Sequence, residues 1–120
     1  MTVLIVDDST YIRSTIRATL EESGFEIVGE AGNGEKAIDA ALELLPDIIT
    51  LDNILPDMTG LDVLKTLRKN DHKAFVVMIS AVGQASSLQK AEELGVSHYL
   101  VKPFDHKKLV AILKEAEINS

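Results

Sequence analysis

Three short, largely apolar runs rich in β-branched residues constrain the fold of this chain more than any other feature. They occupy residues 3–6, 48–51 and 75–79, and none alternates apolar with polar side chains. A strand with this pattern must be covered on both faces, as are the central strands of a parallel sheet. The runs therefore predict three central strands of an α/β fold.

Two weaker runs, residues 25–31 and 98–101, predict edge strands. Between the strands, apolar residues recur at helical spacing. The five predicted stripes are Ile12, Ile16 and Leu20; Ala37, Ile38, Ala41, Leu42 and Leu45; Leu61, Leu64 and Leu67; Leu88, Ala91 and Leu94; and Leu109, Ile112, Leu113 and Ala116. Strand and helix thus alternate five times. We predict a doubly wound, five-stranded parallel sheet of order 2-1-3-4-5 with five helices on its two faces.

Composition limits the classes of function. The 120 residues carry 46% hydrophobic and 26% charged side chains, typical of a globular chain, and we predict one domain spanning residues 1–120. A net charge of −7 argues against a nucleic-acid-binding surface. The sequence has no cysteine, no apolar run near the ~20 residues that span a bilayer, and no recognisable signal peptide. We expect a cytoplasmic monomer that does not enter the membrane.

Charged residues gather where the central strands end. Asp7 and Asp8 follow the first strand, Asp52 the third and Lys102 the fifth. Ligands of such sheets bind beyond the carboxyl ends of the strands, at the point where strand order reverses. Three carboxylates and one ammonium there would leave two negative charges unbalanced, which a divalent ion can neutralise. Hard oxygen ligands without cysteine favour Mg²⁺ or Mn²⁺ over zinc.

Taken singly, these residues also have structural interpretations. Asp52 can be a loop or capping carboxylate, Ser80 can cap a strand end, and Lys102 can be a surface lysine. Tyr99 can pack on an edge strand with its hydroxyl in water. The three histidines, His72, His98 and His106, share no ligand spacing and are predicted to lie at the surface.

As a set, the motifs resemble the CheY-like receiver domain of two-component response regulators. They are Leu4-Ile5-Val6-Asp7-Asp8-Ser9, Asp52-x-x-x-Pro56-x-x-x-Gly60, Ser80-Ala81 and Tyr99-x-x-Lys102-Pro103-Phe104. The resemblance implies a flavodoxin-like receiver, of the single-domain chemotaxis type, whose Asp52 is phosphorylated by a histidine kinase. It implies that Asp7, Asp8, Asp52 and the backbone carbonyl of Ile54 hold Mg²⁺. Ser80 and Lys102 would contact the phosphoryl oxygens.

The resemblance further implies that Tyr99 switches with Ser80 and that the Lys102–Pro103 peptide bond is cis. The output face would be the fourth helix, fifth strand and fifth helix, where a downstream protein binds. The chain would act as a switch that catalyses only its own phosphorylation and dephosphorylation. Ile54 and Val82 stand where fast-cycling chemotaxis receivers often carry polar residues, so we expect a long-lived phosphorylated state.

Several alternatives remain at this stage. A flavodoxin-like electron carrier needs a phosphate-binding loop after the first strand, where the Asp7-Asp8 pair would repel phosphate. An aspartyl-phosphate hydrolase needs an acid/base carboxylate two residues after Asp52, where this chain has Ile54. Within the receiver class, the chain can instead pass its phosphoryl group to a second histidine protein, or be the receiver of a longer regulator.

Overall fold

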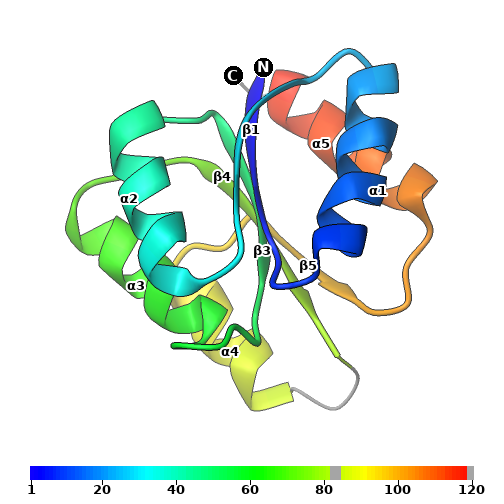
Figure 1. Ribbon diagram of the computed structural model, residues 1–120. Coiled ribbons are helices and arrows are strands. Elements are labelled where there is room, and N and C mark those ends of the chain that lie inside the picture. The colour runs from blue at the N-terminus through cyan, green and yellow to red at the C-terminus, as the bar shows by residue number, and fades with distance from the viewer. Residues whose placement is uncertain (82–84, 119–120) are drawn as a thin grey trace.

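The computed structural model describes residues 1–81 and 85–118 as five strands and five helices in strict alternation (Figure 1). The strands are β1 (Thr2–Val6), β2 (Glu26–Ala31), β3 (Ile48–Asp52), β4 (Phe75–Ser80) and β5 (His98–Val101). The helices are α1 (Thr10–Glu22), α2 (Gly34–Leu44), α3 (Gly60–Lys69), α4 (Ala85–Glu93) and α5 (His106–Ile118). Val82, which the sequence analysis linked to a long-lived phosphorylated state, lies outside the described residues.

All four strand pairs are parallel, and the sheet order is β2-β1-β3-β4-β5. The predicted order and the predicted edge strands are therefore confirmed. Helices α1 and α5 cover one face of the sheet, and α2, α3 and α4 cover the other (Figure 1). In a doubly wound sheet this arrangement places the ligand-binding crevice between the carboxyl ends of β1 and β3.

Side chains of the three central strands alternate between two apolar layers, which explains why their sequences are apolar throughout. Val3, Ile48 and Val77 lie in the layer that includes α1 and α5. Their neighbours Leu4 and Ile49 lie in the layer that includes α2 and α3. All five are fully buried. Burial of a large aliphatic side chain contributes ~1.5–3 kcal/mol, so these strands form a stable floor for the loops above them.

Local capping sets most of the helix boundaries. The Ser9 and Asn33 side chains accept hydrogen bonds from the third residue of α1 and α2, respectively. Thr59 and Asp62 form a capping box at the start of α3. Gly24, just after α1, has a φ of 91°, a left-handed conformation that glycine adopts at little cost.

Four sequence expectations are wrong. Leu42 and Leu45 were placed in the apolar stripe of the second helix and Leu88 in that of the fourth, but these residues are 40%, 68% and 37% exposed, respectively. Leu45 caps α2 in a left-handed conformation with φ 48°, which turns it away from the helical stripe. His72 was placed at the surface but is buried. Its Nε2 lies 3.0 Å from the Ala41 carbonyl oxygen of α2, and this contact gives the buried ring a polar partner.

Across the described ranges 1–81 and 85–118, no helix has both the length and the apolar character required to span a bilayer.

Candidate phosphoacceptor and metal site

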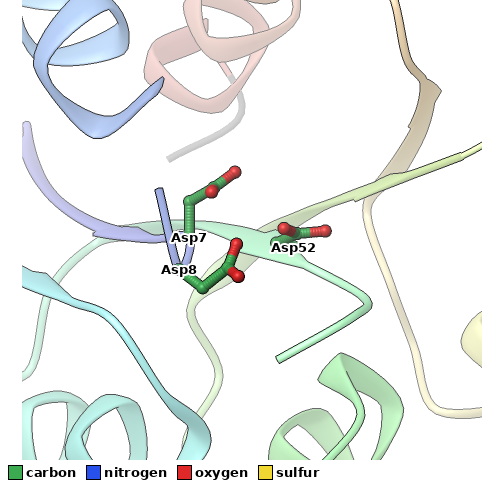
Figure 2. A group of neighbouring side chains, drawn as sticks. All are labelled: Asp7, Asp8 and Asp52. Carbon is green, nitrogen blue, oxygen red and sulfur yellow. The ribbon is translucent and has the colours of Figure 1, made fainter. Parts of the chain in front are cut away.

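Asp7, Asp8 and Asp52 meet at the carboxyl edge of the sheet, as the strand order predicts. Figure 2 shows the first two just beyond β1 and the third at the end of β3. One carboxylate oxygen from each residue lies within 4.8 Å of the others. Asp7 and Asp52 are buried, whereas Asp8 is exposed to solvent. The cluster is therefore open on the Asp8 side and closed underneath.

Lys102 bridges the two buried carboxylates. Its Nζ lies 3.2 Å from Asp7 Oδ2 and 3.3 Å from Asp52 Oδ2. The Lys102 backbone N–H donates to the Ser80 carbonyl oxygen at 2.7 Å, which holds this segment beside the end of β4. The Lys102–Pro103 peptide bond is cis, as the resemblance implied. The lysine thus belongs to the site rather than to the general surface.

Burial and charge shift the titration of this pair in linked ways. Burial, with a further contribution from the nearby Asp7 charge, raises the pKa of the Asp52 carboxyl group, although Lys102 opposes both effects. Burial by itself would lower the pKa of Lys102, but the charges of Asp52 and Asp7 outweigh it and the pKa is raised. Lys102 therefore stays protonated beside the cluster.

The oxygen donors fit a hard divalent cation. Three carboxylates against one ammonium leave two excess negative charges in a small space. Mg²⁺ binds through one or two carboxylates and retains several waters, so an open site with an exposed Asp8 suits it. Asp7, Asp8 and Asp52 are the residues that would hold the ion.

The loop after β3 is built around Asn53, whose role the sequence did not reveal. Asn53 is buried, and its backbone N–H donates to the Ile79 carbonyl oxygen at 2.9 Å, extending the sheet past Asp52. Its carbonyl oxygen accepts from the Gly60 N–H at 2.7 Å. A Cβ at position 60 would lie 2.5 Å from the Asp52 carbonyl oxygen, so only glycine fits there. Asn53 and Gly60 together fix the Asp52 backbone.

Ile54 lies on the open side of this loop. Its backbone N–H donates to Asp52 Oδ1 at 3.3 Å, and its side chain is 60% exposed. The amide orients the Asp52 carboxylate, while the side chain presents an apolar surface beside it.

Ser80 and Tyr99 lie on the neighbouring strands. Ser80 ends β4 and is buried, with its hydroxyl 3.4 Å from the Ala81 carbonyl oxygen. The Tyr99 hydroxyl is also buried and has no hydrogen-bond partner among the described residues. The alternative interpretation of Tyr99, as edge-strand packing with its hydroxyl in water, is therefore wrong about the hydroxyl.

Arg13 and Asp57 are two contributors to the site region that the sequence analysis missed. The Arg13 guanidinium donates to the Asp7 backbone carbonyl. Asp57, in the loop after β3, accepts from the Gly34 and Glu35 backbone N–H groups at 2.7 and 3.0 Å and so ties that loop to α2. For Arg13, the available signal in the sequence was a basic residue one turn into the helix that follows the acidic pair. For Asp57 the sequence gave no signal, because Gly34 lies 23 residues away.

Two hollows differ in their relation to this cluster. One of about 420 Å³ opens beside Lys102 and is lined by Ile12, Pro103, Phe104 and His106. A larger one, about 620 Å³, lies at the opposite edge of the sheet near Arg68 and His72. Of these two hollows, the smaller shares Lys102 with the cluster, whereas the larger is lined by none of the cluster's residues.

These features define a class: a parallel α/β domain with an acidic triad and a lysine at its carboxyl edge. The family described as response regulator receiver domain matches residues 3–114. The chain belongs to this family.

Curated relatives and solved structures agree with that assignment. The chain is 37% identical over 113 residues to the chemotaxis protein CheY of Thermotoga maritima, covering 94% of both chains. It is 36% identical over 113 residues to CheY of Bacillus subtilis, again covering 94% of both. A CheX–CheY–BeF3–Mg²⁺ complex from Borrelia burgdorferi contains a chain with a TM-score of 0.91 and 31% identity, covering 98% of this chain and 89% of that one.

Proposed function

We propose that this chain is a receiver switch in which Asp52 accepts a phosphoryl group from a histidine kinase. The observation that carries the proposal is the contact of Lys102 with both buried carboxylates at the carboxyl edge of β1 and β3. A structural ion pair needs one carboxylate, whereas phosphoryl transfer needs concentrated, positioned charge around a nucleophile.

In the proposed reaction, an Asp52 carboxylate oxygen forms a bond to the phosphorus as the bond from phosphorus to the donor breaks. With a phosphohistidine donor, that bond is P–N and the leaving imidazole takes up a proton. Lys102 neutralises one phosphoryl oxygen, and the Ser80 hydroxyl donates to another after moving toward it. Bound Mg²⁺ would supply neutralisation of the remaining oxygen charge. The chain would catalyse only its own phosphorylation and dephosphorylation.

The proposed output face comprises α4, β5 and α5. It carries exposed apolar side chains, with Leu88 37% and Val101 45% exposed. Ser80 and Tyr99 lie on the adjacent strands β4 and β5, where Ser80 pairs with Val101 and Tyr99 with Met78. Because these strands are adjacent, movement of Ser80 would alter the packing around Tyr99 and at the face beside it. The similarity to CheY proteins supports chemotaxis as the pathway, with a downstream protein as partner.

Acetyl phosphate provides a direct test, since it donates a phosphoryl group without a kinase. Incubation with acetyl phosphate and Mg²⁺ should add one phosphoryl mass, located at Asp52 by peptide mass analysis after borohydride reduction. Asp52→Asn and an EDTA-treated sample should stay unmodified. Equal labelling of either control would overturn the proposal.

A further inference from the structure

The Arg13 guanidinium connects the acidic loop to two other elements. Arg13 lies in α1, and one of its terminal nitrogens, Nη1, donates to the backbone carbonyl oxygen of Asp7. Its Nε lies 3.0 Å from the Glu30 carboxylate on β2, and Nη2 lies 3.4 Å from Thr10 Oγ1. With only 16% of its side chain exposed, the guanidinium is fixed on three sides.

The contact falls on the peptide unit that joins the two acidic residues. The Asp7 carbonyl and the Asp8 N–H belong to one planar group, so holding that carbonyl fixes the plane from which Asp8 leaves. Asp7 itself is held by other contacts: its N–H donates to the Ala31 carbonyl oxygen, and its carboxylate accepts from Ser9 and Lys102. Asp8 is exposed, and among the described residues its carboxylate has no hydrogen-bond or ion-pair partner, so the backbone at the Asp7–Asp8 peptide is the part of the structure that orients it.

Space and charge around Arg13 are arranged for this contact. A Cβ at position 32 would lie 3.2 Å from Arg13 Nη1, so Gly32 leaves room for the guanidinium against the end of β2. Glu30 also holds Arg17, whose Nη1 lies 2.7 Å from the second Glu30 oxygen. The carboxylate is therefore anchored independently of Arg13 and gives the Arg13 fork a fixed support.

We propose that Arg13 is a positioning residue that sets the Asp7–Asp8 peptide and so keeps the Asp8 carboxylate aimed into the Mg²⁺ site. This inference rests on the proposed function and deepens it. Groups that orient metal ligands without touching the ion change metal affinity, commonly by ~10–100-fold when removed. The expected defect is therefore in Mg²⁺ binding rather than in the phosphoryl-transfer step.

The test compares Arg13→Ala with Arg17→Ala. Arg17 is a matched control because it lies on the same helix, carries the same charge and shares Glu30, while its described partners are Glu30 and Glu21. Calorimetric titration with MgCl2 should show about tenfold weaker binding for Arg13→Ala and a wild-type dissociation constant for Arg17→Ala. Labelling by acetyl phosphate should need more Mg²⁺ for half-maximal rate in Arg13→Ala, with a maximal rate within threefold of wild type.

A merely structural role for Arg13 would lower the melting temperature without Mg²⁺ and leave the Mg²⁺ dissociation constant unchanged, which would overturn the inference. Arg13→Lys provides a second variant if Arg13→Ala does not fold. Lysine keeps the charge but cannot hold Glu30 and the carbonyl at once, so we expect at least threefold weaker binding. Wild-type affinity in Arg13→Lys would then overturn it. A wild-type protein that binds no Mg²⁺ would overturn both this inference and the proposed function.

Discussion

At the scale of single residues, ionisation of the Asp52 side chain opposes folding. Its folded-state pKa is raised, chiefly by burial and then by Asp7. A carboxyl group with a raised pKa favours the fold below its ordinary value of 3.8, and this advantage is lost as pH rises through the folded-state pKa. At neutral pH, without metal, the ionised Asp52 therefore destabilises the protein.

We accordingly predict that Asp52→Asn raises the melting temperature in EDTA at pH 7. The difference from wild type should shrink as the pH falls toward the ordinary carboxyl pKa, because both side chains are then neutral. Thermal unfolding followed by circular dichroism between pH 4 and pH 8 measures the difference. A variant that is less stable than wild type at pH 7 would show that Lys102 more than compensates for burial.

Ile54 presents an exposed apolar side chain on the open side of the loop after Asp52, and we expect it to limit access by water. Hydrolysis needs a water in line behind the phosphorus, and the exposed Ile54 side chain cannot hydrogen-bond to it. We predict that Ile54→Asn shortens the phosphorylated lifetime by up to roughly tenfold, or ~1–2 kcal/mol in barrier. Phosphate release from purified phosphoprotein measures the lifetime, with Ile54→Val as the matched apolar control. Equal decay of the three proteins would mean that Ile54 does not set the lifetime.

At the scale of elements, the loop after β3 and the start of α2 depend on each other. Asp57 accepts from the Gly34 and Glu35 N–H groups, and these two bonds lower the pKa of its carboxyl group. A lowered pKa contributes stability above the ordinary carboxyl value, which is lost as pH falls through the folded-state pKa. The negative charge of Asp57 also interacts favourably with the positive, N-terminal end of the α2 dipole.

We predict that Asp57→Asn lowers the melting temperature at pH 7 and that the difference is smaller at pH 3.5, since the stabilisation is lost only as pH falls through the lowered folded-state pKa. Asp39→Asn, which removes a charge from the exposed side of the same helix, should have a much smaller effect. Differential scanning calorimetry at pH 7 and pH 3.5 measures both variants. A deficit that is the same at both pH values would assign the effect to shape rather than charge.

Sequence periodicity predicted the elements well because their determinants are local. The apolar runs, the Thr59–Asp62 capping box and Gly24 act within a few residues of the boundary that they define. The errors have distant causes. The buried His72 ring contacts a carbonyl oxygen on α2, 31 residues away, and nothing around position 72 signals that partner.

The site shows the same division. Asp7, Asp8, Asp52 and Lys102 could be placed together because each follows a strand whose position in the sheet was predictable. Arg13 and Asn53 could not, since they act through backbone groups whose direction the sequence does not specify. The sequence therefore predicted which side chains form the site, but not the backbone contacts that position them.

At the scale of the whole molecule, stability and function oppose each other at one edge of the sheet. Parallel strands bring the ends of β1, β3, β4 and β5 together, so the acidic residues cannot separate without changing the fold. The two apolar layers beneath supply the stability that tolerates this repulsion. A cation that enters the cluster relieves it and should stabilise the entire domain.

We therefore predict that Mg²⁺ raises the melting temperature of the wild-type protein, because it binds the assembled cluster and not the unfolded chain. At ten times its dissociation constant, Mg²⁺ should add about 1.4 kcal/mol, which corresponds to roughly 5–6 °C for a domain of this size. Asp8→Asn should abolish the shift. Without metal it should raise the melting temperature, but less than Asp52→Asn does, because Asp8 is exposed. Differential scanning fluorimetry over a MgCl2 series at constant ionic strength separates binding from screening, with NaCl as the control. An unchanged melting temperature at millimolar Mg²⁺, or an equal rise in Asp8→Asn, would show that these carboxylates do not form the metal site.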